Sequence, residues 1–309
     1  MKLGRIIRKG ARIGLVSPAS PSKKEEVDDL IKYLEGQGFE LALGRTIYKK
    51  NKYLAGTDEE RAADLNQMFG DPDIDAILCI RGGYGSPRIL DLLDYDLIEK
   101  NPKVFIGYSD ITAIHVALNQ KCGLVSYHGP MGSSDMIAGF NPISRENLEA
   151  IVMENGRGRR LENPEGHKLE VLRPGSCQGP VLGGNLSLIV DLIGSDYGLD
   201  PRGKILFIEE VGEEPRNIDR MLNQMRLCGM FEDCLGVILG DFKNCQGDEN
   251  SFSLDQVLDQ YFGDLDLPVV KNFQAGHCEP MLTIPFGPEI RLDTKGPEIL
   301  IMEDTVKGD

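Results

Sequence analysis

The sequence predicts an α/β protein with a parallel-sheet domain at its N-terminus and a second, mixed domain after it. Short apolar runs alternate with helical patterns over roughly the first 130 residues, which implies crossover connections and a sheet covered on both faces. The 309 residues suffice for about two domains at roughly 150 residues each. A charged stretch rich in Gly and Pro, without periodicity, interrupts the pattern between residues 150 and 180.

The first half of the chain is expected to contain alternating strands and helices. The strands are expected at residues 13–17, 39–43, 74–80, 104–106 and 124–127. The helices are expected at residues 22–36, 58–69, 86–93 and 110–120. The second of these helices has a clear start, because Thr57 and Glu60 have the three-residue spacing of a capping box.

The second half is expected to mix helices and strands, with a topology that the pattern does not determine. Strands are expected at residues 205–208, 235–239 and 268–270, and a β tail over residues 277–302. Helices are expected at residues 186–193, 215–227 and 254–262. These patterns predict an N-terminal α/β domain over residues 1–150, a linker over 151–180 and a C-terminal mixed domain over 181–309.

Composition excludes several classes of function. The net charge of −15, from 34 basic and 49 acidic residues, argues against a nucleic-acid surface. No apolar stretch is long enough for a membrane span or a signal peptide, so we expect a cytoplasmic protein. Seven cysteines without two-residue spacing and four histidines without metal-binding spacing argue against disulfides, zinc and a catalytic metal. We therefore expect no cofactor.

Two turns at the carboxyl ends of expected strands, where parallel sheets bind ligands, could carry chemistry. Residues 107–110 place Ser109 between a strand and a helix, as in a nucleophile elbow, and the next amide could bind an oxyanion. The alternative is that Ser109 or Asp110 only caps the helix. The glycine-rich turn at 81–85 could bind a phosphate, donate to an oxyanion or serve only as a turn.

A nucleophilic serine needs a base, and a histidine base needs a carboxylate that orients it. His277, in a loop flanked by Gly and Pro, and His128, at a strand end, are the two candidates for the base. Glu209 and Glu210 end an apolar strand and are candidates for the acid, unless both are simply solvated there.

Six short motifs occur in an order that resembles a known family. They lie at residues 80–85, 107–112, 128–131, 183–186, 206–210 and 276–277. Together they closely resemble the murein tetrapeptide LD-carboxypeptidases, a serine peptidase family that also includes the microcin C immunity peptidases. The resemblance covers roughly residues 10–300.

The resemblance implies a triad of Ser109 as nucleophile, Glu209 as acid and His277 as base. Glu209 is preferred to Glu210 because the acid of the family directly follows the apolar strand, and adjacent strand residues face opposite sides. The implied fold is a flavodoxin-like N-terminal domain and a smaller β-rich C-terminal domain, with the active site between them. The family also implies a homodimer.

The implied oxyanion donors are backbone amides, at Gly83 or Tyr84 in the glycine turn and at Asp110 after the nucleophile. Arg81 lies beside this turn and is a candidate to bind the terminal carboxylate of a peptide, although it could instead pair with a local acid.

The implied reaction is hydrolysis of the L–D amide bond that releases terminal D-Ala from cytoplasmic murein tetrapeptides during peptidoglycan recycling. One alternative is a microcin C-type immunity peptidase that cleaves a peptidyl- or aminoacyl-nucleotide amide. That branch is expected to place a Trp over the nucleobase, and this chain has no Trp. An alternative of another class is a non-catalytic module that binds a nucleotide or flavin at the glycine turn.

Overall fold

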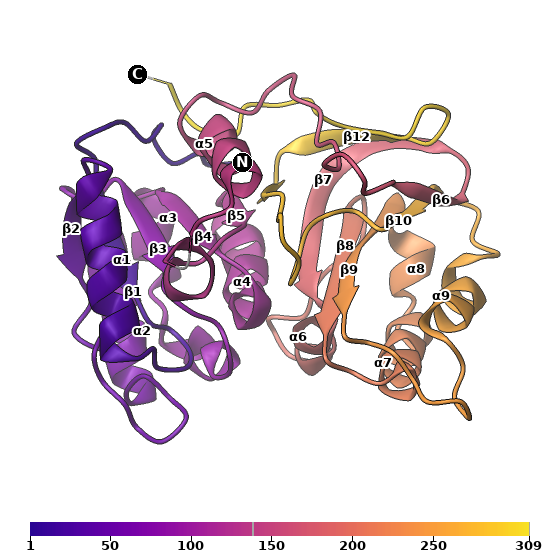
Figure 1. Cartoon of the computed structure of the whole chain (residues 1–309), viewed down its shortest axis with the longest axis horizontal. Helices are drawn as coiled ribbons and strands as arrows, with labels where there is room; N and C mark the ends of the chain where they lie inside the picture. Colours follow the sequence, from indigo (N-terminus) through magenta and orange to yellow (C-terminus); the bar gives the residue numbers. More distant parts are fainter. Residues whose placement is uncertain (138, 309) are drawn as a thin grey trace. The chain divides into compact units, whose positions relative to one another are not determined.

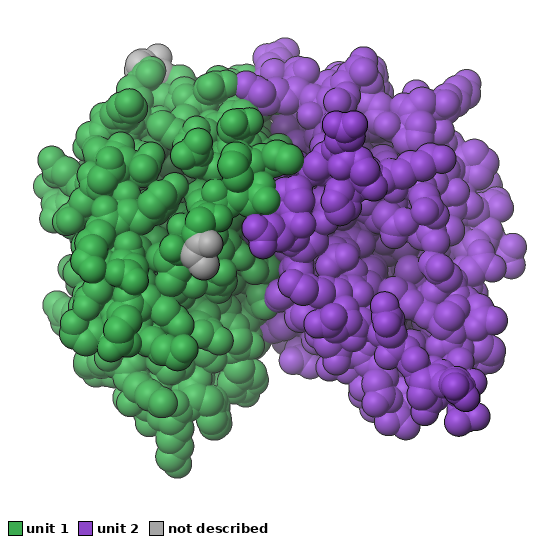
Figure 2. Space-filling view, viewed as in Figure 1, with its two compact units in different colours: residues 1–156, 283–287, 304–309 green, residues 157–282, 288–303 purple. Residues whose placement is uncertain are grey.

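The computed structural model describes residues 1–137 and 139–308, which divide into two compact units (Figures 1 and 2). Unit 1 comprises Met1–Gly156, Thr283–Gly287 and Asp304–Asp309. Unit 2 comprises Arg157–Leu282 and Pro288–Glu303. Each unit has its own sheet and its own buried core.

The sheet of unit 1 has six strands in the order β11-β5-β4-β3-β1-β2. These strands are β1 (Arg12–Val16), β2 (Glu40–Leu43), β3 (Ala76–Cys79), β4 (Val104–Gly107), β5 (Ser126–His128) and β11 (Ile284–Phe286). The first five are parallel, and β11 runs antiparallel to β5 at one edge. The order 2-1-3-4-5 is that of flavodoxin-like sheets, which confirms the predicted fold class.

Helices cover both faces of this sheet (Figure 1). They are α1 (Lys24–Gly36), α2 (Asp58–Gly70), α3 (Tyr95–Lys100), α4 (Thr112–Cys122) and α5 (Pro142–Val152). Shorter helical turns are the 3-10 helices η1 (Ser86–Leu92) and η2 (Ser109–Ile111) and the π-helix η3 (Gly132–Met136). On β4, Phe105 stacks on Phe69 of α2, whereas the next residue, Ile106, faces a space lined by α1 and α5. This alternation explains why the central strands β3 and β4 are apolar and buried on both faces.

The start of α2 agrees with its predicted capping box. The Thr57 side chain accepts a hydrogen bond from the Glu60 amide at 3.2 Å, and the Glu60 carboxylate accepts one from the Thr57 amide at 3.1 Å. Two backbone N–H groups that the helix cannot satisfy internally thereby gain partners.

The sheet of unit 2 has seven strands in the order β13-β12-β7-β8-β9-β10-β6. They are β6 (Glu170–Arg173), β7 (Ser176–Asn185), β8 (Ile205–Val211), β9 (Gly236–Lys243), β10 (Val269–Lys271), β12 (Glu289–Asp293) and β13 (Glu298–Ile301). Strands β7 to β10 are parallel, and antiparallel strands flank them on both sides. The helices of this unit are α6 (Leu186–Asp191), α7 (Pro215–Leu227), α8 (Met230–Asp233) and α9 (Leu254–Phe262).

The structure differs from the sequence-based domain boundaries in two places. Residues 181–309 were expected to form one domain, but Thr283–Gly287 and the C-terminal segment pack with unit 1. The expected linker over 151–180 contains β6 and the start of β7. The side chains of β6 are exposed or half-exposed, and a strand without a buried face carries no apolar alternation that sequence reasoning could detect.

Candidate functional site

Ser109 occupies a strained turn between a strand and a helix. Strand β4 ends at Gly107, η2 begins at Ser109, and α4 continues from Thr112. The φ angle of Ser109 is +63°, in the left-handed region that non-glycine residues seldom adopt. Its side chain is half-buried. A strained serine at the end of a parallel strand is the geometry of a nucleophile elbow.

The glycine turn packs directly against Ser109. A Cβ atom placed on Gly82 would lie 3.1 Å from the Cβ of Ser109 and 3.4 Å from the Asp110 amide nitrogen. This close approach explains why a glycine is needed there, and it brings the two turns that the sequence singled out into contact. The Tyr84 amide donates to Ser20 Oγ at 3.2 Å, which favours Gly83 over Tyr84 as a donor to an oxyanion.

Asp110 holds the glycine turn through its carboxylate. The side chain is buried and accepts hydrogen bonds from the amides of Gly85, at 3.2 Å, and Ser86, at 2.8 Å. The Ser86 hydroxyl donates in return to the Asp110 carbonyl. Burial raises the pKa of Asp110, and these bonds partly oppose the rise. Asp110 thus caps the start of η1 rather than its own helix, a role that differs from the simple helix cap considered for it.

Two residues of this region were not found from the sequence. Arg61 of α2 is fully buried and donates to the carbonyls of Pro18 and, at 2.9 Å, Gly85, so it ties the loop after β1 to the glycine turn. Its position in an amphipathic helix gave no signal. Ser20 lies in the loop after β1, and the rule that ligands bind at the carboxyl ends of strands could have indicated it.

Glu209 and His277 form a hydrogen-bonded pair in unit 2. The Nδ1 atom of His277 lies 2.7 Å from Oε2 of Glu209. Glu209 is fully buried, and the His277 side chain is 17% exposed. Burial raises the pKa of the Glu209 carboxyl, and the hydrogen bond to His277 partly opposes the rise. A buried acid at Nδ1 fixes the orientation of the imidazole and the tautomer in which Nε2 can take up a proton.

Gly276 allows this pair to form. Its φ angle is +109°, and a Cβ atom there would lie 2.8 Å from Oε2 of Glu209. The loop can therefore bring His277 onto the carboxylate only with glycine at this position.

Glu210 has a different set of partners. Its carboxylate accepts hydrogen bonds from the Asn185 side chain at 2.9 Å, from the amide and hydroxyl of Ser187 at 2.9 and 2.6 Å, and from its own neighbour Val211 at 2.8 Å. Both Glu209 and Glu210 are buried, so the alternative of a solvated strand end is wrong.

The other candidate residues lie in varied environments. His128 is buried and packs against the rings of Tyr108 and Phe286. Arg81 is exposed, and so is Tyr84, whose ring contacts the ring of Tyr53 edge-on. Ser109 and these residues, the rival base candidate His128 included, belong to unit 1, whereas Glu209, Glu210 and His277 belong to unit 2.

Among residues 1–137 and 139–308, no group of three or more His, Cys, Asp or Glu side chains could hold a metal ion. No helix in the same part of the chain is long and apolar enough to cross a membrane.

Comparison with known proteins assigns the family. The family model for the LD-carboxypeptidase N-terminal domain matches residues 13–129, and the model for the C-terminal domain matches residues 178–292. A probable murein peptide carboxypeptidase of Bacillus subtilis is 40% identical over 293 residues, which cover 94% of this chain and 91% of the relative. The chain belongs to the S66 family of LD-carboxypeptidases. It is therefore a serine-type peptidase, as the resemblance implied.

Two further relatives show the breadth of this S66 family. The murein tetrapeptide carboxypeptidase of Pseudomonas aeruginosa is 33% identical, over 89% of this chain and 91% of the relative. A solved structure of the microcin C7 self-immunity protein MccF with aspartyl sulfamoyl adenosine matches with a TM-score of 0.91 and 28% identity, over 99% of this chain and all of that chain. The S66 fold thus serves relatives named for two different substrates.

Proposed function

We propose that this S66 peptidase is an LD-carboxypeptidase that hydrolyses the L–D amide bond of murein tetrapeptides and releases terminal D-Ala. The similarity to murein peptide carboxypeptidases supports the class of substrate. The observation that carries the proposal is the buried Glu209 bound to Nδ1 of His277, because a serine carboxypeptidase needs a histidine that is held in one tautomer.

In the proposed mechanism, Nε2 of His277 takes the proton from the hydroxyl of Ser109 as Oγ attacks the scissile carbonyl carbon. The developing oxyanion accepts hydrogen bonds from the amides of Gly83 and Asp110, each worth about 3–4 kcal/mol in well-studied proteases. The protonated His277 then donates to the leaving amine of D-Ala, and an acyl ester on Ser109 remains. Water attacks the ester with His277 again as base, which restores the serine.

Glu209 acts on the imidazolium that forms in both steps. Its carboxylate holds Nδ1–H in place and stabilises the positive charge on the ring. Because the carboxylate is fully buried, the interaction is not weakened by water.

Arg81 is the proposed partner of the substrate carboxylate. It is exposed, it immediately precedes the glycine turn, and its guanidinium could bind a carboxylate through two parallel hydrogen bonds. A clamp of this kind would make the enzyme an exopeptidase, because a chain that continues beyond D-Ala has no carboxylate at that position.

The experiment offers the purified protein three peptides, with Ser109→Ala as the inactive control. The L–D tetrapeptide should turn over rapidly, whereas a pentapeptide with a D–D terminus and the tetrapeptide carboxamide should be cleaved at least about a hundredfold more slowly, because a displacement of about 1 Å costs that much. Comparable rates on the pentapeptide would overturn the LD assignment, and rapid cleavage of the carboxamide would remove the clamp.

The second candidate function is that of an immunity peptidase on a peptidyl- or aminoacyl-nucleotide amide. The structural match to MccF favours it, and the absence of a Trp from this chain argues against it. The same assay with an aspartyl sulfamoyl adenosine substrate separates the two, since only the immunity peptidase should prefer the nucleotide conjugate. We further propose that the enzyme acts in the cytoplasm as a homodimer, takes part in peptidoglycan recycling and needs no cofactor. Light scattering of the purified protein tests the oligomeric state.

A further inference from the structure

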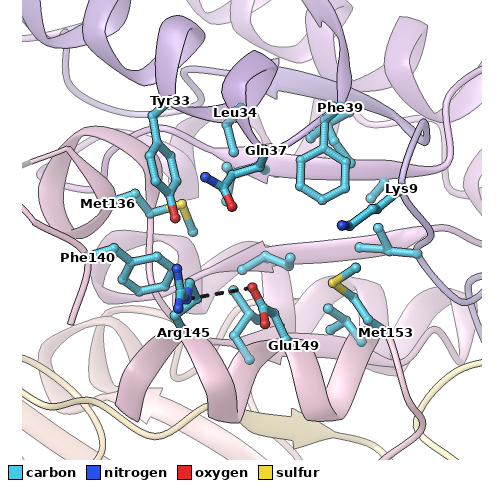
Figure 3. A pocket seen from close by; sticks show the side chains of 17 residues that line it. Lys9, Tyr33, Leu34, Gln37, Phe39, Met136, Phe140, Arg145, Glu149 and Met153 are labelled. Carbon is cyan, nitrogen blue, oxygen red and sulfur yellow. Dashed lines mark ion pairs between the residues drawn. The ribbon is translucent and has the colours of Figure 1, made fainter. Parts of the chain in front are cut away.

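An apolar cavity of about 180 Å³ lies in unit 1, between α1, α5 and one face of the sheet (Figure 3). Its floor consists of side chains that alternate onto the same face of three neighbouring strands, namely Ile13 of β1, Ala76 and Leu78 of β3, and Ile106 of β4. Tyr33 and Leu34 of α1 form one wall, and Leu148 and Val152 of α5 form the other. Most of these side chains are buried, so the space is apolar and sheltered.

Charged and polar groups gather at the rim of this cavity. Figure 3 shows Tyr33 pointing from α1 toward Arg145, which lies beside Glu149 on the opposite wall. Nε of Arg145 is 3.8 Å from the Glu149 carboxylate, too far for a hydrogen bond. Lys9, also on the lining, adds a second positive charge. The rim thus carries two cationic groups and one anionic group.

The Nε–H group of Arg145 lacks an acceptor. The atom is buried, and it makes no hydrogen bond to any residue within 1–137 and 139–308. A buried donor without a partner is unfavourable, and a charged one more so. Burial also raises the pKa of the neighbouring Tyr33, with the Arg145 charge opposing the rise. The Arg145 side chain as a whole is 41% exposed, so a ligand can reach it from solvent. An acceptor placed at the mouth of the cavity would satisfy this donor.

We propose that this cavity binds a small amphipathic carboxylate, with one aromatic or branched aliphatic group in the apolar space and its carboxylate on Nε of Arg145. An apolar cavity of about 150 Å³ is known to admit benzene, so this one has room for a single ring and a short linker but not for a long acyl chain. A guanidinium binds a carboxylate more strongly than a neutral acceptor, which selects the acid over its amide. None of the lining residues belongs to the proposed catalytic set, so the site is additional to the peptidase function.

Phenylacetate is a suitable probe, and phenylacetamide is its neutral match. The chain has ten methionines, and Met136 and Met153 line the cavity, so methyl NMR of protein labelled at the methionine methyl carbon reports on it directly. Phenylacetate should shift these two signals with a roughly millimolar Kd, as expected for a ligand of this size. The signal of Met225, buried in α7, should not move. Phenylacetamide should bind at least about tenfold more weakly.

Two variants and one control test the assignment. Arg145→Gln should weaken phenylacetate binding at least about tenfold and change phenylacetamide binding less than about twofold, because only the charge-assisted bond is lost. Ala76→Ile, which fills the floor with a residue suited to a strand, should abolish binding of both. Arg216→Gln removes an exposed arginine that pairs with Glu214 in unit 2 and should change neither.

Specific results would overturn the proposal. The proposal is wrong if phenylacetate shifts only methionines other than Met136 and Met153, or if these two signals do not shift at concentrations well above a millimolar Kd. It is also wrong if Arg145→Gln leaves phenylacetate binding unchanged. If Ala76→Ile does not fold, the Arg145 comparison decides alone. Peptidase activity is not part of the readout, so failure of this proposal is distinguishable from failure of the proposed function.

Discussion

Glu209 contacts Nδ1 of His277 at 2.7 Å, although the next residue, Glu210, lies on the same strand and is almost equally buried. Neighbouring strand residues face opposite sides of a sheet, so the two carboxylates serve different surroundings. Glu210 is bound by donors at the start of α6, whereas Glu209 orients a histidine. We therefore expect the loss of Glu209 to affect catalysis and the loss of Glu210 to affect stability, although the two side chains are chemically identical.

Replacement of these acids by Gln should separate catalysis from stability. Glu209→Gln should lower kcat by about 10³–10⁴-fold, as expected when a histidine loses the acid that fixes its tautomer, with little loss of thermal stability. Glu210→Gln should instead retain most of the activity and lower the free energy of unfolding by about 1–3 kcal/mol, because an amide cannot accept all the bonds now made. Steady-state kinetics and thermal unfolding of both variants provide the measurement. A larger kcat loss in Glu210→Gln would reverse the assignment.

Gly276→Ala should disrupt the Glu209–His277 pair. The added Cβ atom would meet the Glu209 carboxylate at 2.8 Å, so the carboxylate or the loop must move, and about 1 Å of displacement in a catalytic group costs about a hundredfold in rate. Gly203→Ala is the matched control, since Gly203 also has a positive φ, +68°, but a Cβ there contacts nothing within 4 Å. Both variants should lose some stability, and only Gly276→Ala should lose activity. Equal activity losses would indicate backbone strain alone.

The strained backbone of Ser109 predicts an unusual order of stabilities. Ser109→Ala and Ser109→Gly should both abolish peptidase activity, but Gly adopts the left-handed region without a steric cost. We expect Ser109→Gly to be more stable than Ser109→Ala by about 1 kcal/mol, the cost of that region for a residue with a Cβ atom. Urea unfolding of the two inactive variants, side by side, measures the difference. A Gly variant less stable than the Ala variant would show that the turn stores no strain.

The sequence was sufficient for the parallel strands of unit 1 and for the placement of Ser109 between a strand and a helix, because both depend on local patterns. Apolar runs fix the strands, and a serine between a strand and a helix is recognisable without long-range information. The β tail expected over residues 277–302 contains the edge strand β11, but its place in the sheet of unit 1 could not be predicted, since these three residues form a strand only against β5, about 150 residues earlier in the chain. The alternation of Glu209 and Glu210 is likewise local, but which face meets His277 depends on the course of a distant loop. The roles of Arg61 and Ser20 depend on contacts with loops that are distant in the sequence, and hydrophobic periodicity carries no information about such contacts.

His115 gives unit 1 a stability that depends on pH. It is fully buried, with its Nε2 2.8 Å from the carbonyl oxygen of Gly107, two residues before Ser109, and its Nδ1 2.8 Å from Ser126 Oγ. A carbonyl only accepts, so Nε2 carries the proton and Nδ1 accepts from the serine. Burial lowers the pKa of His115 from 6.5 to about 4. Above pH 6.5 the ring is neutral in both the folded and the unfolded chain and contributes no pH dependence.

As the pH falls from about 6.5 to about 4, the unfolded chain binds a proton at this histidine and the folded chain does not, so stability is lost. At about 1.4 kcal/mol per pH unit this amounts to about 3 kcal/mol by pH 4. His115→Gln removes the titration, so it should be less stable than the wild type at pH 7.5, with a difference that shrinks by about 2 kcal/mol at pH 5. Urea unfolding at pH 7.5, 6 and 5 measures this difference, with His167→Gln, at an exposed histidine, as the control substitution. If the difference in unfolding free energy between His115→Gln and wild type stays constant across this range, His115 has the same pKa in the folded and the unfolded chain. The Gly107 carbonyl would then not be bound by a histidine that stays neutral in the folded state.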